Sequence, residues 1–298
     1  MNHTDSELNR AILNTIVYAD IFDYPLTSAE IHRYLTGACA PLEVVTTLAA
    51  AHRFLRSVGG YYTLPGREAI VSIRERREKE AVRLWRAARF YGRIITGLPF
   101  VRMVAVTGSL AMNNVEAEAD IDYLIVTTPE RLWICRLLTL VVTRLAAFRG
   151  IFLCPNFLLT QNALEMRERS LYAAHEFVQM VPLSGLDLYQ RMRVLNPWVR
   201  DFLPNADGLA PMEGGAAETD SAFRLRPLLE QILMSPPGAW LERWEMERKI
   251  RKLSHENIGN PEAIFSADLC KGHSNRHGQR TVLSLNERLV RLELELIQ

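Results

Sequence analysis

The chain has few cysteines, and the four that it has are scattered (Cys39, Cys135, Cys154, Cys270). No two of them have the spacing of a metal-binding pair, and nothing in their arrangement resembles a disulfide framework. Two lie in apolar runs, where a free cysteine behaves as a small core residue. This usage is typical of a protein of the reducing cytoplasm, which is where we expect the chain to be located.

The sequence also lacks the apolar segments that direct a chain to a membrane or hold it there. Its first residues, Met-Asn-His-Thr-Asp-Ser-Glu, are polar and contain no signal-peptide core. The longest apolar run, 132–148, is interrupted by Arg136 and Arg144. It is also shorter than the roughly 20 residues that cross a bilayer. We therefore expect a buried helix there and no membrane partner.

An excess of charge of either sign is absent as well, since 35 Lys and Arg stand against 34 Asp and Glu. This balance does not indicate a large cationic surface for nucleic acid, although a local basic patch is compatible with it. A length of 298 residues with 48% hydrophobic residues predicts a globular protein, and chains of this length usually hold two domains.

One segment, 104–126, carries more chemical information than the rest of the chain. An apolar run ends in Gly108-Ser109, and a second apolar run carries Asp120 and Asp122 at alternate positions. In a strand, residues i and i+2 point to the same face, so the two carboxylates project together beside the Gly-Ser turn. Like charges held so close need a cation, and Mg²⁺ is a hard ion that prefers oxygen ligands. Because a Gly-Ser turn also lets backbone N–H groups approach a phosphate, the segment predicts phosphoryl or nucleotidyl transfer.

The order Gly108-Ser109-x10-Asp120-x-Asp122 resembles the polymerase-β-like nucleotidyltransferase superfamily, in which a Gly-Ser turn precedes an Asp-x-Asp strand. The resemblance covers about residues 101–160. It implies a mixed α/β fold that binds an NTP, ATP foremost, together with Mg²⁺. Gly108 and Ser109 would hold the triphosphate, and Asp120 and Asp122 would ligate the metal and carry the catalysis.

The third acidic residue of that superfamily, a general base from a later strand, is missing here. Residues 129–148 predict a helix, and the strand expected after it, 151–160, contains no acid. Asn156 stands where we expect the third aspartate, and an amide does not act as a base near neutral pH. Three alternatives stay open: help from another carboxylate such as Glu176, reliance on the metal and on positioning alone, or nucleotide binding without turnover.

Residues 1–66 predict a module of their own, similar to a winged helix-turn-helix. Gly59-Gly60 between two β-prone runs predicts a tight hairpin over 55–64. Thr27 and Glu30 have the spacing of a capping box. Helical periodicity before the hairpin predicts three helices, at 8–21, 28–35 and 42–54.

DNA is a possible partner of this module through residues 42–67. Phosphate affinity comes mostly from Lys and Arg, and the third helix is poor in both. Arg56 and Arg67 near the hairpin keep DNA binding open. We place a role in protein contacts, or in covering the active site, slightly ahead of it.

Beyond the module we expect a connecting helix at 67–97, a nucleotidyltransferase-like core at 98–203, a mobile loop at 204–221 and a helical C-terminal region at 222–298. The connecting helix interleaves acids and bases, which predicts a solvated spacer. A basic cluster in a loop-like context contains Lys271, His273, Arg276 and His277. Lys271 and His273 are candidates for binding the nucleotide triphosphate.

The expected fold class is α+β: a nucleotidyltransferase-like mixed sheet with flanking helices, preceded by a winged helix-turn-helix and followed by a helical region. The expected function is Mg²⁺-dependent transfer of a nucleoside monophosphate from an NTP to an unidentified acceptor. The main alternative is a catalytically degenerate regulator that senses a nucleotide and binds DNA. A third is a scaffold that uses the fold for protein contacts alone.

Overall fold

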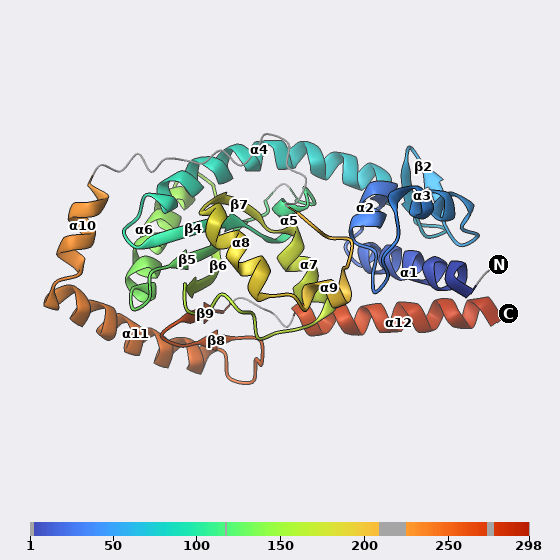
Figure 1. Cartoon of the computed structure of the whole chain (residues 1–298). Coiled ribbons are helices and arrows are strands. Elements are labelled where there is room, and N and C mark those ends of the chain that lie inside the picture. The colour runs from blue at the N-terminus through green and yellow to red at the C-terminus, as the bar shows by residue number, and fades with distance from the viewer. Residues whose placement is uncertain (1–2, 117, 209–224, 273–276, 298) are drawn as a thin grey trace.

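The computed structural model describes residues 3–116, 118–208, 225–272 and 277–297 (Figure 1). Its N-terminal module contains three helices and a three-stranded antiparallel sheet in the order β1-β3-β2. The three helices and the hairpin appear in the predicted order, whereas β1 was not predicted. Thr27 and Glu30 form the predicted capping box at the start of α2. The elements are α1 (His3–Asp20), β1 (Leu26–Thr27), α2 (Ser28–Arg33), α3 (Leu42–Ala51), β2 (Arg56–Val58) and β3 (Tyr61–Thr63).

Helix α4 (Ile70–Thr96) runs from the module along the whole of the following domain (Figure 1). The helix itself was predicted, but the prediction that it is a solvated spacer is wrong. Ala81, Leu84, Ala88, Tyr91 and Ile95 are buried on one of its faces and belong to the main hydrophobic core. Charged residues such as Arg76 and Lys79 lie on its exposed surface, although Arg74 is buried and forms an ion pair with Glu30. Helix α4 is therefore an amphipathic helix of the fold.

The central sheet has six strands in the order β7-β4-β5-β6-β9-β8. Strands β5 and β6 are parallel and are joined by helix α6 (Leu132–Ala147), while all other neighbours are antiparallel. Strands β7, β8 and β9 were not predicted, and β9 lies where the sequence indicated a loop. The strands are β4 (Val101–Val106), β5 (Ile121–Thr127), β6 (Leu153–Thr160), β7 (Val181–Ser184), β8 (Ile264–Phe265) and β9 (Leu269–Lys271).

Helices cover both faces of this sheet and enclose two hydrophobic clusters. Helices α4, α6 and α11 contribute to one cluster, and α7, α8 and α9 to the other. The apolar run predicted as a buried helix is α6, with Trp133, Ile134 and Cys135 in the core. Among the described residues, no helix has the length and apolar character to cross a membrane. The remaining helices are α5 (Gly108–Ala111), α7 (Leu171–Gln179), α8 (Leu186–Leu195), α9 (Val199–Phe202), α10 (Arg226–Leu233) and α11 (Pro236–Glu256).

The last helix, α12 (His277–Ile297), lies beside α1 at the opposite end of the chain (Figure 1). Leu285 is buried in the core of the N-terminal module, and Arg288 forms an ion pair with Asp20 of α1. The beginning of the predicted mobile loop is held in place, because the Asn205 side chain donates hydrogen bonds to the carbonyls of His32 and Ala40. The rest of that loop, 209–221, lies outside the described residues.

Candidate functional site

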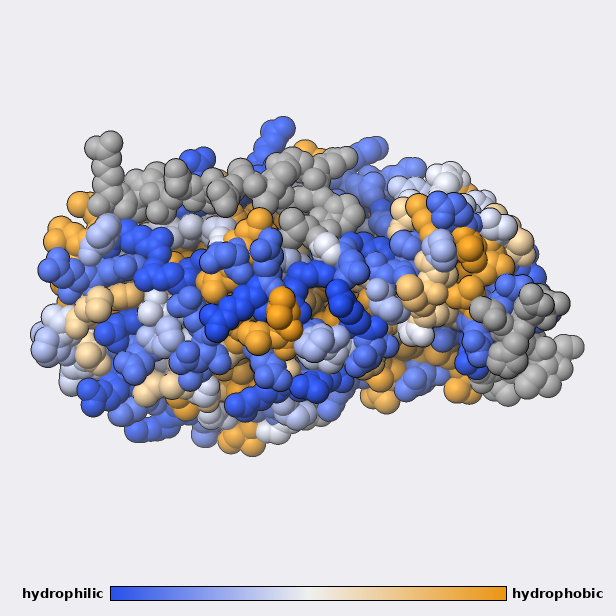
Figure 2. Space-filling model, in the orientation of Figure 1, coloured by the Kyte–Doolittle hydropathy of each residue, from blue (hydrophilic) through white to orange (hydrophobic). Residues whose placement is uncertain are grey.

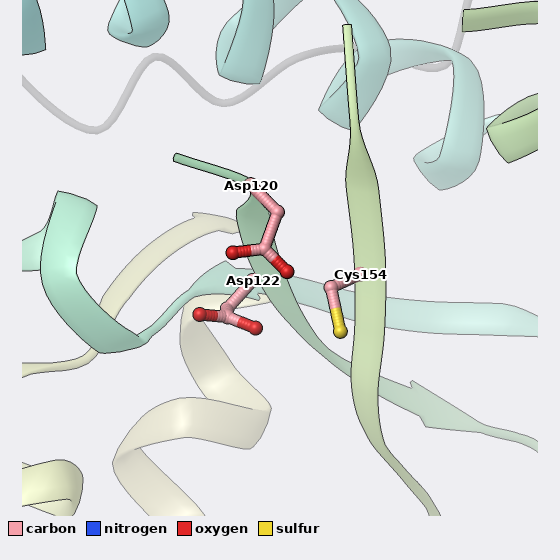
Figure 3. Close-up of side chains that lie close together, drawn as sticks. All are labelled: Asp120, Asp122 and Cys154. Atoms are coloured by element: carbon pink, nitrogen blue, oxygen red, sulfur yellow. The ribbon is translucent and has the colours of Figure 1, made fainter. Parts of the chain in front are cut away.

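The two aspartates lie at the start of strand β5, where it passes the Gly-Ser turn. Asp120 precedes the strand and is exposed, whereas Asp122 is its second residue and is half-buried. Figure 3 shows their carboxyl groups close together, with the Cys154 thiol facing them from the neighbouring strand. One ligand atom from each of the three residues lies within 4.8 Å of the other two. The pairing predicted from the i, i+2 spacing is therefore present.

Gly108 lets the turn after β4 approach the carboxylates. Its φ is +66°, and a Cβ atom there would lie 2.4 Å from Oδ2 of Asp122. The backbone N–H of Thr107 donates to the carbonyl of Asp122 at 3.1 Å, which fixes the turn against β5. The short helix α5 begins at Gly108 and contains Ser109. Glycine is thus required here both for its backbone conformation and for its lack of a side chain.

Cys154 lies in an apolar run of the sequence, but it is not a fully buried core residue. It is half-buried and lies opposite Asp122 in the parallel register of β5 and β6. Burial and the two neighbouring carboxylates raise the pKa of its thiol well above the usual range. At neutral pH the group is therefore a protonated thiol that can donate a hydrogen bond to a carboxylate.

Two carboxyl groups of the site have strongly shifted pKa values. Burial, followed by the charges of Asp120 and Glu176, raises the pKa of Asp122 to about 7, although a hydrogen bond from Cys154 opposes the shift. Burial also raises the pKa of Glu176 to about 7, against the opposing effect of Lys271. Both groups therefore titrate near neutral pH, which is frequent at functional sites.

A cavity of about 550 Å³ opens in front of the carboxylates. It brings together the predicted residues Gly108, Ser109, Asp120 and Asp122, and it adds Glu176 from α7. Asn156, at the position expected for a third aspartate, lines it as well. The remaining lining residues come from the N-terminal module, the loop after α5, strand β6, helix α7 and the start of α12: Thr15, Tyr18, Ala19, Phe22, Tyr24, Leu26, Tyr34, Met112, Asn114, Cys154, Tyr172, His175, Gln179 and His277.

Of the basic cluster predicted around Lys271, the structure places His277 at this cavity but not Lys271, and Arg276 lies outside the described residues. Lys271, on β9, lines a separate cavity of about 1450 Å³ and forms an ion pair with Glu168 at 2.8 Å. His273 lies outside the described residues. Among the residues that the structure describes, neither lysine nor arginine lines the cavity of Asp120 and Asp122.

Covering the active site was one of the roles expected for the N-terminal module, but the residues with which the module lines the cavity have no signal in the sequence. About a third of the chain, including the long helix α4, separates the aspartates from the aromatic residues of the module: Tyr18, Phe22, Tyr24 and Tyr34. Their role depends on how the module docks, which no local pattern encodes. They are the largest group of site residues that sequence reasoning missed.

Comparison of the chain with protein-family models, with curated proteins and with solved structures finds no match in any of the three. Its function is therefore argued from the chemistry of the site.

Proposed function

We propose that the chain is a Mg²⁺-dependent nucleotidyltransferase of the polymerase-β-like superfamily, with a winged helix-turn-helix module at its N-terminal end. It transfers a nucleoside monophosphate from an NTP, ATP foremost, to a hydroxyl or phosphate acceptor and releases pyrophosphate. The observation that carries the proposal is the convergence of Asp120 and Asp122 on one cavity, beside the turn at Gly108.

The donor set of this cavity fits a hard divalent cation. Asp120 and Asp122 offer carboxylate oxygens close together, and their mutual repulsion favours a positive ion between them. Cys154 is a soft donor that Mg²⁺ does not prefer, and its raised pKa keeps it protonated, so we assign it the role of a hydrogen-bond donor. When bound, Mg²⁺ would supply the positive charge that a triphosphate requires in this acidic cavity.

Glu176 is the group we propose as the general base in place of the missing third aspartate. It lines the same cavity, and its pKa of about 7 suits proton transfer near neutral pH. Asn156 would hydrogen-bond the substrate without taking its proton. Of the three alternatives left open by the sequence, the structure supports best an enzyme helped by another carboxylate.

The test is calorimetric titration with non-hydrolysable NTP analogues, ATP first, with and without Mg²⁺. We expect metal-dependent binding that is lost in Asp120→Asn/Asp122→Asn and kept in Glu118→Gln, an exposed acid of the same loop that does not line the cavity. Glu176→Gln should bind the analogue normally, but with a hydrolysable NTP and an acceptor it should lose most of the pyrophosphate release. Metal-independent binding, or binding that survives the double substitution, would contradict the proposal.

The second candidate is a regulator that binds a nucleotide without turnover and contacts DNA through its N-terminal module. Asn156 favours it, because the position expected for the third carboxylate has no acid. Helix α3, in contrast, contains neither lysine nor arginine. The arginines that follow it in the sequence are Arg53 and Arg56. Salt-dependent retention of duplex DNA, weakened in Arg53→Ala/Arg56→Ala and without pyrophosphate release, would favour the regulator.

A further inference from the structure

The cavity has two walls of different chemistry. Asp120, Asp122 and Glu176 form an acidic wall that belongs to the central domain. The other wall comes from the N-terminal module and is largely aromatic, with Tyr18 from α1 and Phe22 from the turn that follows it. A triphosphate and its metal account for the first wall only.

Phe22 is the most exposed of the module's aromatic residues that line this cavity. Its exposed fraction is 39%, against 5% for Tyr18, 7% for Tyr24 and 5% for Tyr34. The three tyrosines are therefore part of the supporting structure. The Tyr18 ring packs against Phe22 with ring centroids 5.6 Å apart, and it stacks on His175 at 4.0 Å. Phe22 thus rests on a packed base and has ring surface free for contact.

The backbone that carries Phe22 is tied to the loop between the Gly-Ser turn and the aspartates. The carbonyl of Phe22 accepts hydrogen bonds from Arg77 at 3.1 Å and from the side chain of Asn114 at 3.0 Å. Arg77 also donates to the side-chain oxygen of Asn114, and the backbone N–H of Asn114 donates to the carbonyl of Ser109 at 2.9 Å. The backbone that carries the ring is therefore held in position relative to the predicted phosphate turn.

We propose that Phe22 is the platform on which the planar ring of a small-molecule substrate stacks, so that the N-terminal module completes the site. The ring belongs either to the nucleobase of the NTP or to an aromatic acceptor, and in both cases the contact is π-stacking on Phe22. The triphosphate part of this inference rests on the proposed function, but the ring site does not. A cavity of about 550 Å³ is in the range of small-molecule sites.

Stacking on an aromatic side chain tolerates any base, because every base has a π-face. We therefore expect little preference among the four NTPs at this position. Replacing a stacking residue with alanine weakens binding by roughly 5- to 150-fold.

The experiment compares three probes on the full chain in the presence of Mg²⁺: a non-hydrolysable NTP analogue, inorganic tripolyphosphate and a nucleoside. They carry ring and phosphates, phosphates alone, and a ring alone. The variants are Phe22→Ala, Phe22→Trp and, as a control, Phe148→Ala, because Phe148 is 88% exposed and does not line the cavity. A thermal melt of each variant reports whether its fold is kept.

We expect Phe22→Ala to weaken binding of the NTP analogue at least fivefold while leaving tripolyphosphate unchanged, and Phe22→Trp to restore it. This result places the nucleobase on Phe22. If only nucleoside binding depends on Phe22, and the nucleoside binds together with the NTP analogue, the ring is that of the acceptor. Equal affinities of Phe22→Ala and wild type for every probe would overturn the ring site while leaving the proposed function intact.

Failure of the proposed function gives a different pattern. If neither tripolyphosphate nor the NTP analogue binds, but a nucleoside binds in a Phe22-dependent way, the ring site stands without the transferase. If the wild type binds none of the probes, both proposals are wrong.

Discussion

Asp122 combines burial with a neighbouring carboxylate, and the resulting pKa of about 7 links the site to folding stability. An unfolded aspartate has a pKa near 3.9, so the folded state binds the proton more tightly than the unfolded state. As the pH rises from about 4 to 7, the unfolded chain loses its proton first, and the free energy of unfolding decreases. Above pH 7 the loss is complete and the stability no longer depends on this group.

Asp122→Asn should therefore stabilise the metal-free protein, because the amide removes the buried charge. The expected gain at pH 8 is on the order of 2 kcal/mol, or roughly 5 °C in Tm. At about pH 3 the gain should disappear, since aspartate is then mostly protonated in both states. Thermal melts in EDTA across this pH range provide the measurement, with Glu118→Gln, at an exposed acid that does not line the cavity, as the control. A lower Tm for Asp122→Asn at pH 8 would show that the carboxylate has a stabilising partner in the metal-free protein.

Alanine substitutions at Gly108 and Gly150 can separate the cost of a strained backbone from the cost of a steric clash between the new side chain and the Asp122 carboxylate. Gly108 and Gly150 have similar positive φ values of +66° and +70°, but a Cβ atom at Gly150 would meet nothing within 4 Å. Both alanine substitutions should cost about 1 kcal/mol of stability from the backbone conformation. Gly108→Ala should cost more and should also abolish metal-dependent nucleotide binding, because its Cβ displaces the Asp122 carboxylate. Equal behaviour of the two variants in urea unfolding and calorimetry would contradict this view of the turn.

For individual residues, the sequence predicted the contacts between residues that lie close together along the chain. Gly108, Ser109, Asp120 and Asp122 belong to one strand–turn–strand segment, and the alternation of a strand is enough to place both carboxylates on one face. Cys154 could not be placed in the same way, because its position opposite Asp122 depends on the register between two parallel strands joined by a helix. Apolar neighbours made it look like a core residue.

Among the elements, helix α6 shows how a distant side chain completes a helix end. The carboxylate of Glu242, on α11, accepts hydrogen bonds from the backbone N–H groups of Trp133 at 2.9 Å and Ile134 at 2.7 Å. Glu242 is buried, and α6 has no side-chain cap of its own. The first turn of a helix requires such acceptors, so α11 both packs on α6 and caps its N-terminal end.

Glu242→Ala should lower the free energy of unfolding by about 1–3 kcal/mol, because two buried N–H groups lose their acceptor. Glu247→Ala is the matched control, since Glu247 is an exposed glutamate of the same helix. Urea unfolding of the two variants provides the comparison, and Glu242→Gln should recover part of the loss through its amide oxygen. An effect of Glu242→Ala no larger than that of Glu247→Ala would argue against the capping role.

The long elements were predictable from periodicity, whereas the short ones were not. Helices α4 and α6 span 27 and 16 residues, so their periodic patterns are well defined. Strands β7 and β9 have only four and three residues, and β7 contains Pro182. They are strands because existing strands of the sheet offer them hydrogen bonds, which is a tertiary effect that a short segment does not reveal.

For the whole molecule, the main departure from the sequence is that the predicted modules are interdependent. Residues 1–66 contribute a wall of the cavity, and α12, from the opposite end of the chain, packs on α1. Domain boundaries predicted from the sequence are placed where the residue pattern changes along the chain. They do not show which surfaces of the resulting segments pack against one another. The placement of Phe22 near the aspartates therefore depends on contacts that span almost the entire sequence.

Asp20 is the centre of one such contact, and its contribution can be measured. Asp20 is buried, and its carboxylate forms ion pairs with Arg67, at 2.7 Å, and with Arg288 of α12. A double-mutant cycle of Asp20→Asn and Arg288→Gln should give a coupling energy of about 1–2 kcal/mol, since hydrogen bonds to charged groups are stronger than neutral ones. The exposed pair Lys252 and Glu256 on α11 is the control, and its coupling should not exceed about 0.5 kcal/mol.

Hydrogen exchange distinguishes a local from a global effect of the same substitutions. If the ion pair fastens α12 to the module, Asp20→Asn should accelerate exchange in α12 and α1 before it affects the strands of the central sheet. Nucleotide binding should weaken in parallel, because α1 supports the turn that carries Phe22. Unchanged exchange in α12 together with a negligible coupling energy would mean that hydrophobic contacts such as those of Leu285 hold the two ends together without this ion pair.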